Sequence, residues 1–162
     1  MTLRFMRNKL VQVEPLREGA LSVDWRSEDD LLRAEIRMKI RLPDLEIEAV
    51  EGGILRSTHP ECAAASNLLP KVVGVRVGPG LRKIVYGLLG GTKGCEELAE
   101  GVLECCNAVI LNFTLPQIQA MEHCTEEERR EGFKEMLRFN PRLVRSCVAF
   151  ADDSPMMQGL DL

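Results

Sequence analysis

The sequence predicts an α+β fold in which an N-terminal antiparallel β-meander carries helices packed on one face, a two-layer arrangement. Residues 32–42 alternate between apolar and charged side chains, which is the period of a half-buried strand. From residue 98 to residue 113, apolar residues recur at spacings of three and four, the period of a helix. A chain of 162 residues is long enough for one hydrophobic core. We therefore expect a single α+β domain over residues 1–150 and a flexible C-terminal tail over residues 151–162.

The first part of the chain reads as strands separated by polar turns. Residues 3–13 are apolar without a clean period, which fits an edge strand or an arm. Residues 21–25 alternate and predict a second strand, and residues 27–30 form a polar stretch that we interpret as a turn. The strand over residues 32–42 ends at the turn dipeptide Pro43-Asp44.

A tight hairpin at this turn would place charges of opposite sign across from each other. Arg41 would face Glu46, and Lys39 would face Glu48. Such cross-strand pairs each contribute roughly 0.2–1 kcal/mol.

After residue 59 the period changes from two to that of a helix. Proline suits the first position of a helix, and a Thr-x-x-Glu sequence forms a capping box. The long apolar stripe after residue 98 marks the central helix, which we expect to cover the sheet. The predicted helices begin near Pro60, Leu81, Cys95, Thr125 and Pro141.

Composition narrows the class of partner. The net charge of −4 argues against a dedicated nucleic-acid binder. The basic residues of the 32–42 strand either bind an acidic partner or form a solvated face countered by Glu46 and Glu48, and the second interpretation is favoured. No signal peptide is recognisable at the start, and no window reaches the apolar length expected of a membrane span. We therefore expect a cytoplasmic protein without a membrane partner.

The six cysteines are expected to be reduced in such a compartment, as free thiols, metal ligands or packing residues. Cys62 and Cys95 fall in the first turns of two predicted helices, where a thiolate is stabilised, as suits a nucleophile or a metal ligand. They can equally be small packing residues. His59 lies three residues before Cys62 and either shares a metal with it or belongs to a surface loop. Cys106 and Cys147 are expected in the core.

Three segments resemble the bacterial family known as domain of unknown function 2889. They are residues 59–64, residues 73–80 and the Leu-Gly-Gly-Thr-Lys-Gly-Cys sequence at 89–95. The resemblance covers roughly residues 31–109. Members typically carry Thr-His after the last cysteine, where this chain has Glu96 and Glu97. The resemblance to this family does not imply any particular reaction.

A second resemblance is to the NifU-like iron–sulfur scaffold fold, which SufE sulfur acceptors also use. The sequence from Cys62 to Ser66 is similar to the cysteine segment that opens the first scaffold helix, and Gly94 to Glu100 to the segment that opens the last. The first scaffold cysteine has no counterpart, and Gly94 replaces a histidine. The resemblance implies that Cys62 and Cys95 share one pocket at one end of the sheet. Residues that would border it or supply further ligands are His59, Glu97, Asp29 and Asp30.

Three functions remain open. The chain is a non-enzymatic binding or interaction module, with a protein partner or as a homodimer; a zinc or iron–sulfur protein that uses Cys62, Cys95, His59 and Glu97; or a thiol or sulfur relay with one reactive cysteine. The first is favoured because the scaffold ligand set is incomplete. No catalytic residue can be assigned.

Overall fold

The computed structural model describes residues 4–42, 44–139 and 141–159. The chain divides into two compact units, Met1–Asn112 and Phe113–Leu162. The first unit contains the sheet and the helices that cover it, and the second contains the remaining helices. The expected single domain over residues 1–150, with a flexible tail after it, stays a prediction.

The first unit begins with an antiparallel four-stranded sheet whose strands follow one another in chain order. Its strands are β1 (Arg7–Leu16), β2 (Ala20–Asp29), β3 (Leu32–Arg41) and β4 (Glu46–Ser57). The predicted α+β fold with an N-terminal meander is therefore confirmed. The turn predicted at residues 27–30 is wrong in extent, because residues 27–29 continue β2, and Ser27 and Asp29 are buried.

The hairpin between β3 and β4 has nearly the expected register. Arg41 lies opposite Glu46, as predicted. A bulge between Lys39 and Ile40 shifts the next pair, so that Lys39 faces Ala49 rather than Glu48. Lys39 Nζ still lies 3.3 Å from a carboxylate oxygen of Glu48. The outer face of the hairpin is therefore a set of ion pairs, as the solvated-face interpretation expects.

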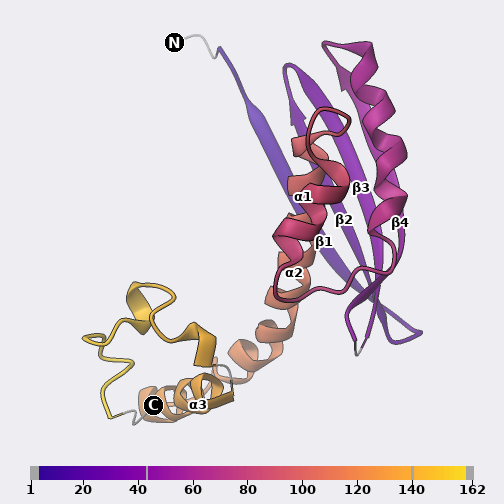
Figure 1. Ribbon diagram of the computed structural model, residues 1–162. Helices are drawn as coiled ribbons and strands as arrows, with labels where there is room; N and C mark the ends of the chain where they lie inside the picture. The colour runs from indigo at the N-terminus through magenta and orange to yellow at the C-terminus, as the bar shows by residue number, and fades with distance from the viewer. Residues whose placement is uncertain (1–3, 43, 140, 160–162) are drawn as a thin grey trace. The chain divides into compact units, whose positions relative to one another are not determined.

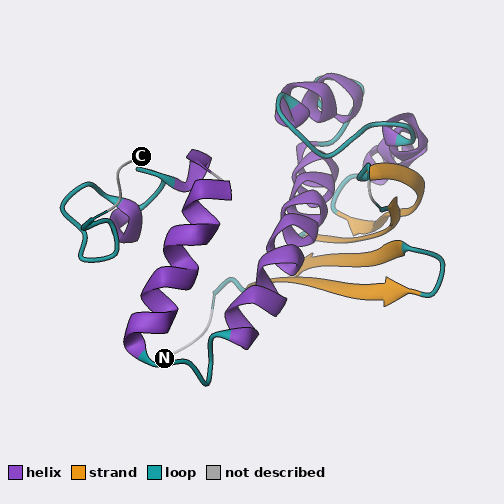
Figure 2. Cartoon of the chain, turned by 90° about the horizontal axis from the view of Figure 1, so that it is seen from below, coloured by secondary structure: helices purple, strands orange, loops and turns teal. Residues whose placement is uncertain are grey.

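Helices cover the other face of this sheet (Figures 1 and 2). They are the 3₁₀ helix η1 (Pro60–Val72), α1 (Leu81–Leu89) and the first part of α2 (Glu96–Ala120). The buried apolar side chains of β2 and β3 pack against buried residues of these helices in one core cluster. The helix α2 approaches the sheet closely at Gly101, where an added Cβ would lie 2.8 Å from Ile36 and 3.0 Å from Trp25.

The helix α2 is longer than the sequence predicted. It spans 25 residues and continues past Phe113 through Pro116. By length and composition it is apolar enough to cross a membrane, with a mean hydropathy of 1.4 in its most apolar stretch, of which 39% is buried. The expectation that no window reaches that length is therefore wrong. The buried helix of a globular core meets the same criterion, so the expectation of no membrane partner stays a prediction.

The second unit contains α3 (Glu126–Phe139) and two short 3₁₀ helices, η2 (Pro141–Leu143) and η3 (Val148–Phe150). The predicted capping box is confirmed: the Thr125 amide donates to a Glu128 carboxylate oxygen at 2.8 Å, and the Glu128 amide donates to Thr125 Oγ1 at 3.3 Å. The expectation of a buried Cys147 is wrong. It immediately precedes η3 and is exposed, because the short helices around it bury little apolar surface.

Candidate functional site

The two predicted site cysteines lie at the starts of helices, as expected. Cys62 is in the first turn of η1, where its amide donates to the His59 carbonyl at 3.1 Å. Cys95 directly precedes α2; its amide donates to the Leu89 carbonyl at 2.7 Å, and its carbonyl accepts from the Ala99 amide. Both thiols are free, half-buried and packed against the core. His59 is exposed.

The starts of η1 and α2 lie at the same end of the sheet (Figure 1). Register places Ser57, the last residue of β4, opposite Leu32, the first residue of β3. Glu97, in the first turn of α2, accepts a hydrogen bond from Ser27, which lies close to the same end of β2. The predicted common pocket for the two sulfurs stays a prediction.

The other two thiols of the first unit have a different environment. Cys105 and Cys106 are both buried in the core, so the expectation for Cys106 is confirmed. Burial, supported by the neighbouring Cys106, raises the pKa of Cys105, and burial raises the pKa of Cys106 to about 12. Neither forms a thiolate at neutral pH, and both are packing residues.

Glu97 belongs to a polar cluster that joins β1 and β2 to α2. We call the side chains of Arg7, Lys9, Ser27, Asp29, Glu97 and Glu104 the β1–α2 cluster. Ser27 Oγ donates to Glu97 at 2.8 Å, and Lys9 Nζ lies 3.0 Å from Glu97 and 3.3 Å from Glu104. Glu104 also accepts a hydrogen bond from the indole of Trp25. The cluster therefore fixes the first turns of α2 on the sheet.

Asp29 anchors the other end of the cluster. Burial acts to raise the pKa of its carboxyl, but hydrogen bonds from Arg7 and from the amides of Leu31 and Leu32 outweigh burial and lower the pKa. Arg7 lies 2.6 Å from the carboxylate, and each amide donates to it at 2.7 Å. Asp29 consequently stays ionised at neutral pH and holds β1 against the turn between β2 and β3.

Sequence reasoning missed Ser27, Arg7, Lys9 and Glu104 as members of this cluster. One signal was present, because Ser27 and Asp29 continue the alternation of Leu21, Val23 and Trp25 on the inner face of β2. Their polarity instead suggested a turn. A buried polar pair at the end of an alternating strand indicates a partner on a covering helix.

The residues predicted as a metal site do not fit one as they are arranged. The described residues include no group of three or more histidine, cysteine, aspartate or glutamate side chains placed to hold a metal ion. Glu97 is engaged by Ser27 and Lys9. A Cβ at Gly94 would lie 1.9 Å from the Leu89 carbonyl oxygen, so the scaffold histidine has no room at this position without a shift of the backbone.

The two edges of the sheet differ. The start of β4 is closed by the segment after η1: the Ile47 amide donates to the Val75 carbonyl, the Gly74 amide to the Ile47 carbonyl, and the Val77 amide to the Leu45 carbonyl, at 2.9–3.0 Å. On the opposite side, β1 is a ten-residue edge strand, and no strand in the described part of the chain pairs with its outer edge. Open backbone groups of this kind can pair with another chain.

Comparison with known proteins supports the first resemblance. The family model described as a protein of unknown function (DUF2889) matches residues 15–110, which is more than half of the chain. The match includes β2, β3, β4, η1, α1, both site cysteines and Glu97. No curated protein and no solved structure matches the chain, so the NifU-like resemblance is not confirmed. The chain therefore belongs to the DUF2889 family of proteins of unknown function.

Proposed function

We propose that this chain is a protein-interaction module whose binding element is the outer edge of β1, and that its partner is a second copy of the same chain. The observation behind this proposal is that no strand in the described part of the chain pairs with the outer edge of β1. The two copies pair their β1 strands antiparallel about a two-fold axis and join their sheets into one.

The edge is held in a fixed position, which favours binding. Arg7 and Lys9 point toward the helix-covered face, where Asp29, Glu97 and Glu104 neutralise them. Inward-pointing charges can protect an edge strand from pairing, but here they are already paired within the protomer. Leu10, on the outer face of the sheet, is 51% exposed.

Pro15 indicates which amides face outward. Proline in an edge strand occupies a position whose missing N–H would point away from the sheet. Because successive residues direct their N–H groups to opposite edges, the amides of Lys9, Val11 and Val13 face outward with Pro15.

The outward direction of the amides of odd-numbered residues favours a register between the two β1 strands that is centred on Val11. Val11 then faces its own copy, Lys9 faces Val13, and Asn8 faces Glu14, so that no like charges meet. Pro15 lies at the end of the ladder, where it interrupts least. The half-buried side chains of Val11 and Val13 continue the core across the junction.

Proline substitutions at two adjacent positions test this proposal. Val11→Pro removes an outward amide and should give a folded monomer. Leu10→Pro removes an amide of the β1–β2 ladder and should destabilise the fold by about 3 kcal/mol. Sedimentation equilibrium measures the mass, and circular dichroism with urea unfolding measures the fold. A monomeric parent protein, or a Val11→Pro variant that stays folded and dimeric, contradicts the proposal.

Sulfur relay is a second candidate, favoured by the contrast between the half-buried Cys62 and Cys95 at helix starts and the buried Cys105 and Cys106. In such a relay, one thiolate attacks the outer sulfur of a donor persulfide, the donor S–S bond breaks, and the donor thiolate leaves.

Alkylation of the native protein at pH 7, read residue by residue by mass spectrometry, tests this candidate. A reactive Cys62 or Cys95 should be modified about tenfold faster than the exposed Cys147. Zinc and iron analysis of the same sample tests the metal alternative. Alkylation of Cys62 and Cys95 no faster than that of Cys147, together with no bound metal, would leave both cysteines as packing residues.

A further inference from the structure

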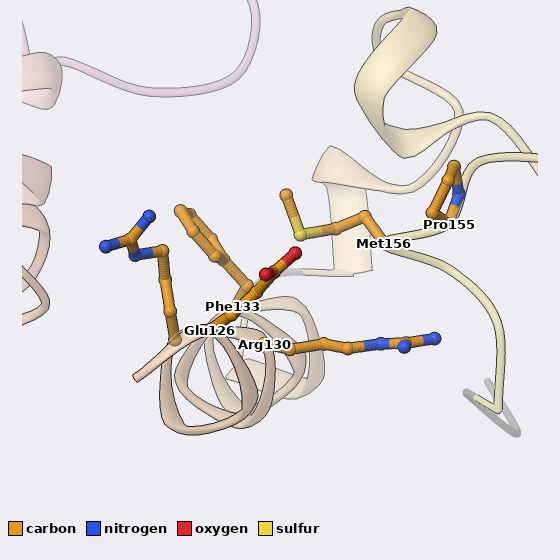
Figure 3. Close-up of a pocket in the computed structure, with 6 residues that line it drawn as sticks. Glu126, Arg130, Phe133, Pro155 and Met156 are labelled. Atoms are coloured by element: carbon orange, nitrogen blue, oxygen red, sulfur yellow. The ribbon is translucent and has the colours of Figure 1, made fainter. Parts of the chain in front are cut away.

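The second unit contains a pocket of about 500 Å³ between α3 and the C-terminal loop. Phe133, Pro155 and Met156 supply its apolar lining, and Glu126, Arg129 and Arg130 supply its charges. Figure 3 shows the labelled side chains of Glu126, Phe133 and Met156 gathered on one side of the pocket, with Arg130 extending along its base toward the side of Pro155. This volume is in the range of sites for small organic molecules.

Two of the three charged side chains of the pocket, those of Glu126 and Arg129, form no ion pair with any described residue. Two nearby acidic side chains are engaged: Glu128 caps α3, and Glu131 lies 2.5 Å from Lys134. Glu126 precedes Arg129 by three residues and Arg130 by four, the spacings at which helix ion pairs form. It nevertheless makes no ion pair with any described residue, and Arg130 donates instead to the Gln158 carbonyl at 3.2 Å.

The combination of charges limits the ligand. Glu126 would repel a simple anion, and Arg129 and Arg130 would repel a simple cation. A zwitterion satisfies both signs: a carboxylate accepts from a guanidinium, and an ammonium group binds the glutamate. The apolar lining adds contact for a hydrophobic side chain, and sulfur and aromatic groups also attract each other.

We propose that this pocket binds a free amino acid with an apolar side chain. The carboxylate of the ligand contacts Arg129 and Arg130, its ammonium group contacts Glu126, and its side chain packs on Phe133 and Met156. This site is independent of the β1 edge, because every lining residue belongs to the second unit.

Calorimetric titration of the full chain with L-phenylalanine, L-leucine and L-methionine tests the site. At least one should bind. Its N-acetyl derivative lacks the ammonium group, and its amide derivative lacks the carboxylate; each should bind about tenfold more weakly. Glu126→Gln should weaken the free amino acid but leave the N-acetyl derivative unchanged, and Arg129→Gln with Arg130→Gln should weaken the free amino acid but not its amide.

Arg138→Gln is the matched control, because this exposed arginine lies in the last turn of the same helix and does not line the pocket. It should bind like the parent chain. Failure of all three amino acids to bind would overturn the proposal, as would equal binding of the two derivatives and the free amino acid. Circular dichroism confirms that each variant is folded.

Discussion

Replacement of Ile40 by aspartate should abolish the folded state. Ile40 is fully buried in β3, between Leu21 of β2 and Ile47 of β4. The substitution removes apolar contacts and places a carboxylate in a core without a cationic partner. Desolvation of an unpaired charge costs several kcal/mol, which is comparable to the total stability of a domain of about 5–15 kcal/mol. Circular dichroism and urea titration should show no cooperative unfolding transition.

Lys39→Asp is the control for this prediction, because it changes the adjacent residue on the opposite face. Lys39 lies 3.3 Å from both Glu18 and Glu48, and its side chain is 36% exposed. Loss of these surface ion pairs should cost only about 1 kcal/mol. If the two variants are equally stable, the two faces of β3 are assigned incorrectly.

Gly101→Val should destabilise the protein strongly, by about 3 kcal/mol, at the upper end for overpacking in a core. An added Cβ at Gly101 already lies within 3.0 Å of Ile36 and of the Trp25 ring. The isoleucine methyl group can rotate away, but the indole is fixed by its hydrogen bond to Glu104. The helix α2 must therefore move off the sheet. Urea unfolding measures the loss.

Gly87→Val is the matched control in α1. This glycine is helical and exposed, and an added Cβ there would meet no atom within 4 Å. Valine has a helix propensity a few tenths of a kcal/mol better than that of glycine, so the stability should change little. If Gly101→Val lowers the free energy of unfolding no more than Gly87→Val does, α2 does not approach the sheet closely at Gly101.

Local patterns predicted the elements that carry their own signal. The alternation in residues 32–42 identified β3 and its apolar face, and the Thr125–Glu128 capping box marked the start of α3. In both cases the interacting residues lie close in sequence, so period and spacing describe the contact directly. The placement of Cys62 and Cys95 at helix starts follows from the same kind of signal.

Contacts between distant segments were not predictable in this way. Ser27 and Glu97 are 70 residues apart, and nothing in either local sequence identifies the other. From the sequence alone, Ser27 and Asp29 suggest a turn, because their partners lie in α2 and β1, which are distant in the chain. The pocket beside Phe133 likewise depends on the return of the C-terminal loop to α3. The open edge of β1 follows from the order of the strands in the sheet. The sequence of β1 has no clean period, so it does not reveal that order.

The central claim, that β1 pairs with a second copy of itself, is tested most directly by amide hydrogen exchange resolved to single residues. We predict that Val11 and Val13 exchange slowly at high protein concentration and faster on dilution, because their amides donate across the junction. The amides of Leu10 and Gln12, which face β2, should remain protected at both concentrations and serve as the internal control. Fast exchange at Val11 and Val13 at every concentration, with Leu10 and Gln12 protected, would contradict the account.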